Sequence, residues 1–121
     1  MKQADRIILE KMIGYCDDIL SIMERLGASK ESYQQDKVYQ YAVGMCILQI
    51  GELTARLSDE AKQETAQIPW RLIRAMRNVF AHNYEKAEHE LIWQTISEDI
   101  PIFRKQLQEA LQCGKASPPS P

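Results

Sequence analysis

Residues 69–84 hold the side chains whose types and spacing suit chemistry on an anion. Arg71, Arg74 and Arg77 recur at intervals of three, and His82, one of only two histidines in the chain, follows them. No acidic residue occurs in this segment, so it carries +3, whereas the whole chain carries −2 and the remainder therefore −5. A guanidinium holds a phosphate through paired hydrogen bonds, and an imidazole exchanges protons near neutral pH. We therefore expect a phosphodiester site here.

The reaction that suits these groups is metal-free cleavage of RNA. A neutral imidazole can take the proton of a ribose 2′-OH, an imidazolium can return a proton to the leaving 5′ oxygen, and a guanidinium stabilises the charge that builds on the phosphate. On one ideal helix, however, Arg77 and His82 point about 140° apart. Either the helix bends or ends near His82, or a second subunit supplies the missing group, as a two-fold dimer would. We expect no cofactor.

Three less specific interpretations stay open for the same residues. An arginine and a histidine on a helix are often plain surface residues, and the segment could bind an anion without catalysis. A metal site is the third, because Glu85 lies between His82 and His89. That spacing does not match the helical His-Glu-x-x-His zinc motif, so we expect no metal.

The elements that must position this segment read as helices. The chain of 121 residues contains only five glycines, and its apolar residues recur at spacings of three and four. We predict a single all-α domain over residues 1–113, an antiparallel bundle of four main helices, followed by a disordered tail over 114–121. A polar connection is expected over 28–36, a short helical turn capped by Ser58 over 58–68, and a kink near Pro101. The four helices are expected over residues 5–26, 36–57, 69–84 and 88–112.

The second helix is apolar over so wide an arc that it should pack on two sides, one of them a subunit interface or a further helix. Gly44 and Gly51 lie seven positions apart, on one face of this helix, and would allow another backbone to approach closely. Glu52 is a carboxylate among apolar positions and should find a partner. We expect an arginine of the 69–84 helix or a place at the interface, and both a supporting role at the site and a simple polar contact remain open.

The chain begins without the apolar stretch of a signal peptide, and no run of 18 apolar residues occurs. We therefore expect a cytoplasmic protein with no membrane partner. Cys16 and Cys46 fall on apolar helical stripes and are predicted to be buried thiols.

At these residues the sequence resembles the HEPN superfamily, specifically the HepT toxins of bacterial HepT–MntA toxin–antitoxin systems. Arg77-x4-His82-x-Tyr84 resembles the Arg-x4-His-x-Tyr motif, although Asn83 stands where the family more often has Asp. Further matches follow the chain in the family's order: Ile50-Gly51-Glu52, Ile68-Pro69-Trp70-Arg71, Met76-Arg77-Asn78, Trp93 and Asp99-Ile100-Pro101.

This resemblance implies a HEPN-like homodimer that acts as the toxin of a type VII-like system, a metal-independent endoribonuclease with a composite cleft at the dimer interface. It assigns catalysis to Arg77 and His82, on RNA such as tRNA or mRNA. It also implies an MntA-like minimal nucleotidyltransferase antitoxin that transfers AMP to Tyr84. An adenylate there would cover Arg77, because the two positions lie within about 20° on an ideal helix. The residues expected to contact phosphate or RNA beside them are Arg71, Arg74, Asn78 and Asn83.

Two other functions compete with this one. The chain could be a non-enzymatic helical module that binds a nucleotidyltransferase partner, RNA or both, with Arg77 and His82 as anion contacts. It could also be a dimerising adaptor built on its wide apolar second helix. The acidity of the whole chain argues against broad nonspecific RNA binding and favours a small cleft.

Overall fold

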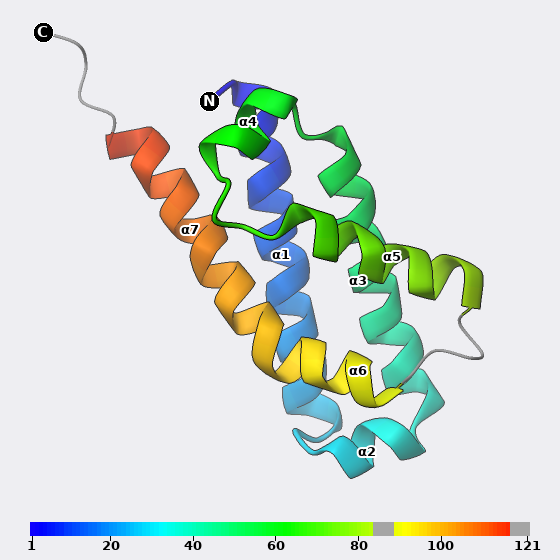
Figure 1. Ribbon diagram of the computed structural model, residues 1–121. Helices are drawn as coiled ribbons and strands as arrows, with labels where there is room; N and C mark the ends of the chain where they lie inside the picture. Colours follow the sequence, from blue (N-terminus) through cyan, green and yellow to red (C-terminus); the bar gives the residue numbers. More distant parts are fainter. Residues whose placement is uncertain (84–88, 117–121) are drawn as a thin grey trace, which may run out of the picture.

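The computed structural model describes residues 1–83 and 89–116, without the side chains of 79–83 and 113–116. Over these residues the structure contains helices and no strand, which confirms the all-α prediction (Figure 1). The elements are α1 (Gln3–Leu26), α2 (Lys30–Gln35), α3 (Lys37–Arg56), α4 (Asp59–Glu64), α5 (Trp70–Asn83), α6 (His89–Gln94), the π-helix η2 (Thr95–Asp99) and α7 (Ile100–Ala116).

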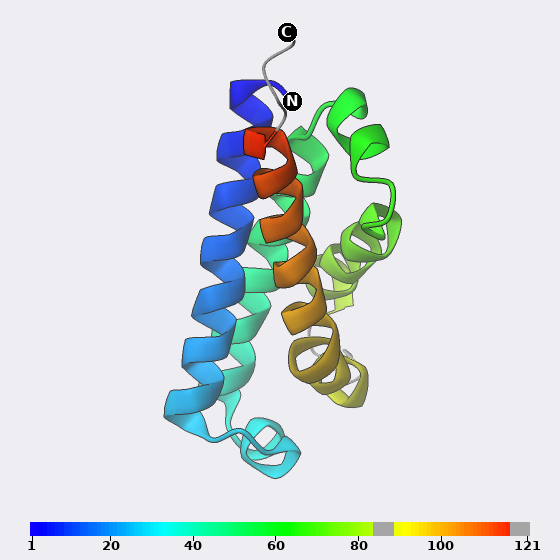
Figure 2. The same ribbon diagram turned by 90° about the vertical axis from the view of Figure 1, so that its left-hand side faces the viewer.

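Helices α1, α3 and α7 lie side by side, with α1 antiparallel to the other two, and α5 crosses over α3 (Figures 1 and 2). The core lies between α1, α3 and α7. Among the side chains at its centre are Leu9, Met12, Ile19, Val43, Ile96 and Leu107, all with almost no exposed surface. Burial of such side chains is the main source of stability in a bundle of this kind. Cys16 and Cys46 are buried as predicted.

The prediction of a polar connection over residues 28–36 is wrong, because most of this segment forms helix α2. Ser29 caps the helix by accepting a hydrogen bond from the Ser32 N–H at 3.1 Å. Tyr33 is fully buried and packs edge-on against Tyr39 of α3, with ring centroids 5.3 Å apart. One buried aromatic side chain therefore holds a short polar helix that the surrounding sequence pattern does not reveal.

The expected break near Pro101 takes the form of a π-helical turn. Proline has no N–H to donate to the carbonyl four residues earlier. The chain adjusts just before it, where the Ile100 N–H donates to the Thr95 carbonyl five residues back. Figure 1 shows α6 and α7 running in different directions on the two sides of this turn.

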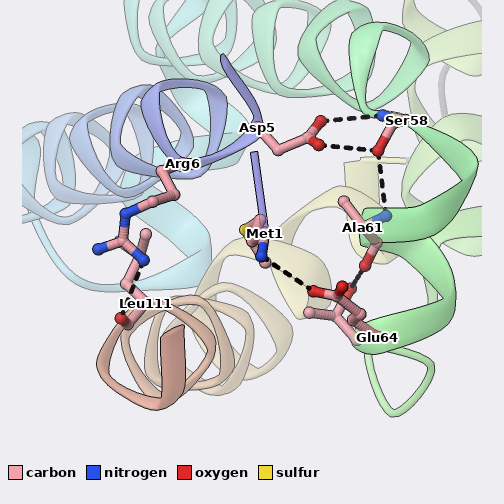
Figure 3. Close-up of polar contacts among 8 residues, drawn as sticks. Met1, Asp5, Arg6, Ser58, Ala61, Glu64 and Leu111 are labelled. Atoms are coloured by element: carbon pink, nitrogen blue, oxygen red, sulfur yellow. Dashed lines mark hydrogen bonds and ion pairs between the residues drawn. The ribbon is translucent and has the colours of Figure 1, made fainter. Parts of the chain in front are cut away.

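At one end of the bundle a buried carboxylate, Asp5 of α1, links α1 to the start of α4 (Figure 3). Asp5 accepts hydrogen bonds from the Ser58 N–H at 3.0 Å and from the Ser58 hydroxyl at 2.7 Å. The same hydroxyl accepts from the Ala61 N–H, so Ser58 caps α4 as predicted. Burial by itself would raise the pKa of Asp5, but the hydrogen bonds from Ser58, together with nearby Lys2, bring that pKa below its usual value.

Helix α7 runs to Ala116, past residue 114, where the disordered tail was expected to begin, and residues 117–121 lie outside the described part of the chain. None of the helices in the described ranges is long and apolar enough to cross a membrane.

Candidate anion site at the crossing of α3 and α5

Arg77 of α5 is held in place by Glu52 of α3. The Arg77 Nε–H donates to Glu52 Oε1 at 2.7 Å, and an Nη2–H donates to the same oxygen. An Nη1–H donates to the Asn78 side-chain oxygen at 3.2 Å. The Arg77 side chain is 32% exposed and that of Glu52 46%. The expected arginine partner of Glu52 is thus found, and it presents a fixed guanidinium at the protein surface.

The absence of a side chain at Gly51 lets α5 come this close to α3. A Cβ built at Gly51 would lie 2.2 Å from Arg77 Cβ and 2.4 Å from Arg77 Cγ. Carbon atoms in contact normally lie at least about 3.5 Å apart. Only glycine therefore permits this crossing, and the residue that follows Gly51 along α3 is the partner of Arg77.

The other two arginines of the segment face solvent. Arg71 and Arg74 are exposed, and neither makes an ion pair with any residue whose side chain the structure describes. Asn78 is exposed too and takes part in the site through its hydrogen bond with Arg77. The +3 charge of the segment is therefore reduced at Arg77 by Glu52 and retained at the two earlier positions.

Helix α5 continues without a break through the position of His82 and ends at Asn83. A regular helix places positions 77 and 82 about 140° apart, so no bend between them brings both toward one phosphate. The side chains of His82 and Asn83, and all of Tyr84, lie outside the described residues. The expectations for these three residues therefore stay predictions.

The apolar face of α5 is only partly buried. Ile73 and Met76 are half-buried, but Leu72 is 68% exposed. These three side chains line a pocket of about 360 Å³ between α3, α5, η2 and α7. Partial burial and the nearby charge of Glu98 raise the pKa of Asp99, which also lines this pocket. The sequence carries no signal for this pocket, because it arises from how α5 crosses the bundle.

The second histidine belongs to a different contact. His89, at the start of α6, shares a hydrogen bond of 2.8 Å between its Nδ1 and the Tyr33 hydroxyl of α2. Lys30 and Glu90 form an ion pair beside it at 2.7 Å. In the part of the chain that the structure describes, no three histidine, cysteine or acidic side chains gather in a way that could hold a metal ion. Sequence reasoning missed the link between α2 and α6 because it did not expect α2.

Comparison with known proteins places these residues in a family context. Residues 9–110 match the family model described as "Ribonuclease HepT-like". The protein named "Putative RNase TTE0752" of Caldanaerobacter subterraneus subsp. tengcongensis is 31% identical over 91% of this chain and 96% of its own length. "Probable ribonuclease HepT" of Thermococcus cleftensis is 30% identical over 65% of this chain and 72% of its own. "Putative RNase MJ1216" of Methanocaldococcus jannaschii is 23% identical over 92% and 90%. No solved structure matches significantly.

Proposed function

Because the chain belongs to the HepT-like ribonuclease family, we propose that it is a metal-independent endoribonuclease with Arg77 and His82 as its catalytic pair. The observation that carries this proposal is the fixed guanidinium of Arg77, which Glu52 holds at the protein surface on the same helix as His82. A partly exposed arginine in a defined orientation is what binding of an RNA phosphate needs.

The proposed reaction uses the ribose 2′-OH as nucleophile. His82 takes the 2′-OH proton while the 2′ oxygen attacks the adjacent phosphorus, and the bond from phosphorus to the 5′ oxygen breaks. The leaving 5′ oxygen takes a proton from an imidazolium, and the products are a 2′,3′-cyclic phosphate and a free 5′-hydroxyl. Arg77 stabilises the negative charge on the phosphate oxygens. Arg71 and Arg74, together with Asn78 and Asn83, contact the neighbouring phosphates or the RNA.

We propose further that the active form is a homodimer. The unbroken α5 separates positions 77 and 82, so a composite cleft needs a group from a second copy. The outer face of α3 supports this, because Val38, Tyr41 and Met45 are all more than half exposed although apolar. Met45→Glu should yield a monomer in light scattering, with Lys37→Glu at the start of the same helix as the charge control. A Met45→Glu protein that remains dimeric would move the interface elsewhere.

The antitoxin relation is proposed at the motif tyrosine. The Tyr84 hydroxyl would attack the α-phosphorus of ATP bound to a minimal nucleotidyltransferase, so that pyrophosphate leaves and the tyrosine proton is released. Adenylated protein should lose RNA cleavage because the added phosphate competes for Arg77. Mass spectrometry of the Tyr84 peptide before and after incubation with such a partner and ATP measures this. Cleavage that persists on fully modified protein would contradict it.

The alternative is a non-enzymatic module that binds a nucleotidyltransferase or RNA. One observation favours it, since Glu52 already neutralises Arg77 and the pair could be a structural tie between α3 and α5. Under this alternative, protein with unmodified Tyr84 binds its partner but cleaves no RNA.

The test uses purified protein whose Tyr84 is unmodified by mass spectrometry, incubated with tRNA and mRNA with and without EDTA. We expect cleavage that resists EDTA and is lost in Arg77→Ala and in His82→Ala. Arg25→Ala, at the end of α1, is the control for loss of an arginine. Absence of cleavage by the wild type would refute the ribonuclease proposal and favour the binding module.

A further inference from the structure

We propose that Glu52 is a positioning residue for catalysis, which holds Arg77 by one edge so that its other N–H groups face the RNA phosphate. This inference rests on the proposed ribonuclease function and adds a role for a residue outside the Arg-His motif.

The hydrogen bonds of Arg77 divide its guanidinium into an occupied and an open part. A guanidinium has five N–H donors. Three of them are engaged in the structure, the Nε–H and an Nη2–H by Glu52 and an Nη1–H by Asn78. One N–H on each terminal nitrogen remains. A phosphate can therefore bind two N–H groups of Arg77 without displacing Glu52.

The position of Glu52 makes it suited to this task. Both hydrogen bonds from Arg77 end on a single oxygen, Oε1, next to Gly51, which lets α5 approach α3 closely. Arginine has a long side chain with many rotamers, and a partly exposed one would otherwise sample them in water. A charge-assisted hydrogen bond to a carboxylate on a neighbouring helix restricts it to one orientation before substrate arrives.

The contact with Glu52 gives Arg77 a different role from that of Arg71 and Arg74. Glu52 offsets the charge of Arg77, so attraction of RNA from solution falls to Arg71 and Arg74, which are exposed and make no ion pair with the described side chains. We expect substitutions at Arg71 and Arg74 to act on KM and on its salt dependence. Substitution of Glu52 should act on kcat.

The test compares Glu52→Gln with Glu52→Ala in the full-length protein. Glutamine keeps an Oε1 that can accept both hydrogen bonds, so kcat should fall by less than about tenfold, whereas alanine should lower it by about 10- to 100-fold because a misplaced catalytic group loses that much. KM should stay equal or decrease in both. Glu24→Gln, on an exposed part of α1, controls for loss of one negative charge.

The Arg77→Lys variant, which lacks the guanidinium, shows whether Glu52 affects kcat through Arg77 or independently of it. In Arg77→Lys, which has no Nε–H, Glu52→Ala should lower kcat by less than about twofold, because there is no fork left to orient. A role of Glu52 that does not run through Arg77 predicts equal fold losses of kcat in both backgrounds, and a purely structural tie predicts a lower Tm of Glu52→Ala. Equal losses, or a Glu52→Ala kcat within twofold of wild type, would overturn the proposal.

A readout independent of activity is the NMR signal of the Arg77 Nε–H in ¹⁵N-labelled protein. We expect it to exchange slowly with water in the wild type and in Glu52→Gln, and to resemble the exposed Arg71 and Arg74 in Glu52→Ala. Cleavage by a wild type whose Arg77 signal already resembles those of Arg71 and Arg74 would overturn this proposal alone. A protected signal in a wild type that cleaves no RNA would refute the ribonuclease proposal and leave Glu52 a structural partner.

Discussion

Replacement of Gly51 by alanine tests whether the close approach of α3 and α5 controls the site. A methyl group at this position would lie 2.2 Å from Arg77 Cβ, so the two atoms must separate by more than an ångström to reach ordinary contact. Arg77 Cβ is the root of a side chain and cannot move without its backbone. Helix α5 must therefore shift away from α3, or α3 must deform.

The size of the effect follows from two opposing contributions. Overpacking of this kind typically costs about 1–3 kcal/mol. Alanine in place of glycine within a helix returns up to about 1 kcal/mol. We expect the free energy of unfolding of Gly51→Ala to fall by about 1–2 kcal/mol, and cleavage to fall by up to about 100-fold because Arg77 is displaced by roughly 1 Å.

Gly14 provides a matched control, because it lies on the exposed side of α1 and a Cβ there would meet nothing within 4 Å. Gly14→Ala should raise the free energy of unfolding by about 0.5–1 kcal/mol and leave cleavage unchanged. Urea denaturation followed by circular dichroism measures both variants. A Gly51→Ala protein as stable and as active as Gly14→Ala would refute the close crossing as the basis of the site.

Three further predictions concern the rest of the fold. Asp5→Ala should lower the free energy of unfolding by about 1–3 kcal/mol at pH 7, because the carboxylate accepts two hydrogen bonds from Ser58. Since the folded-state pKa of Asp5 is lowered, this contribution is present above the unfolded pKa and is lost as pH falls through the folded value, so the urea midpoints of the two proteins should converge as the solution is acidified below the folded-state pKa. Tyr33→Phe should cost about 1 kcal/mol in the same assay through loss of its hydroxyl hydrogen bond, and no change would contradict that contact. Burial raises the pKa of Cys16 to about 12 and that of Cys46 to about 11, so an alkylating reagent at pH 8 should label neither in the folded protein, and labelling seen by mass spectrometry would count against their burial.

The sequence pattern was sufficient for the helices with long apolar stripes and for the cap at Ser58. The four main helices, the Ser58 cap and the break before Pro101 all follow from local rules, namely periodicity, a hydroxyl that can accept from a free N–H, and a missing donor. Helix α2 was missed because it depends on Tyr33, a single side chain whose burial is decided by α3 and α6.

At the site, too, some features follow from local sequence rules and others depend on how the helices pack. Gly51 and Glu52 could be singled out because a glycine in a helix and a carboxylate among apolar positions each contradict local preference and so call for a tertiary reason. Their shared partner, Arg77, required the crossing of two helices. The exposed Leu72 and the pocket beneath it could not be predicted, since periodicity says which face of α5 is apolar but not how much of it the bundle covers.

The most direct test of the proposed chemistry is cleavage of a short RNA in which the nucleotide before the mapped cut carries a 2′-deoxyribose. We expect the wild type to cut the all-ribose strand to a 2′,3′-cyclic phosphate and to leave the substituted strand intact at that bond, because the nucleophile is absent. Cleavage of the substituted strand at the same bond and rate would contradict it, since the attacking group would then not be the 2′-OH that His82 is proposed to activate.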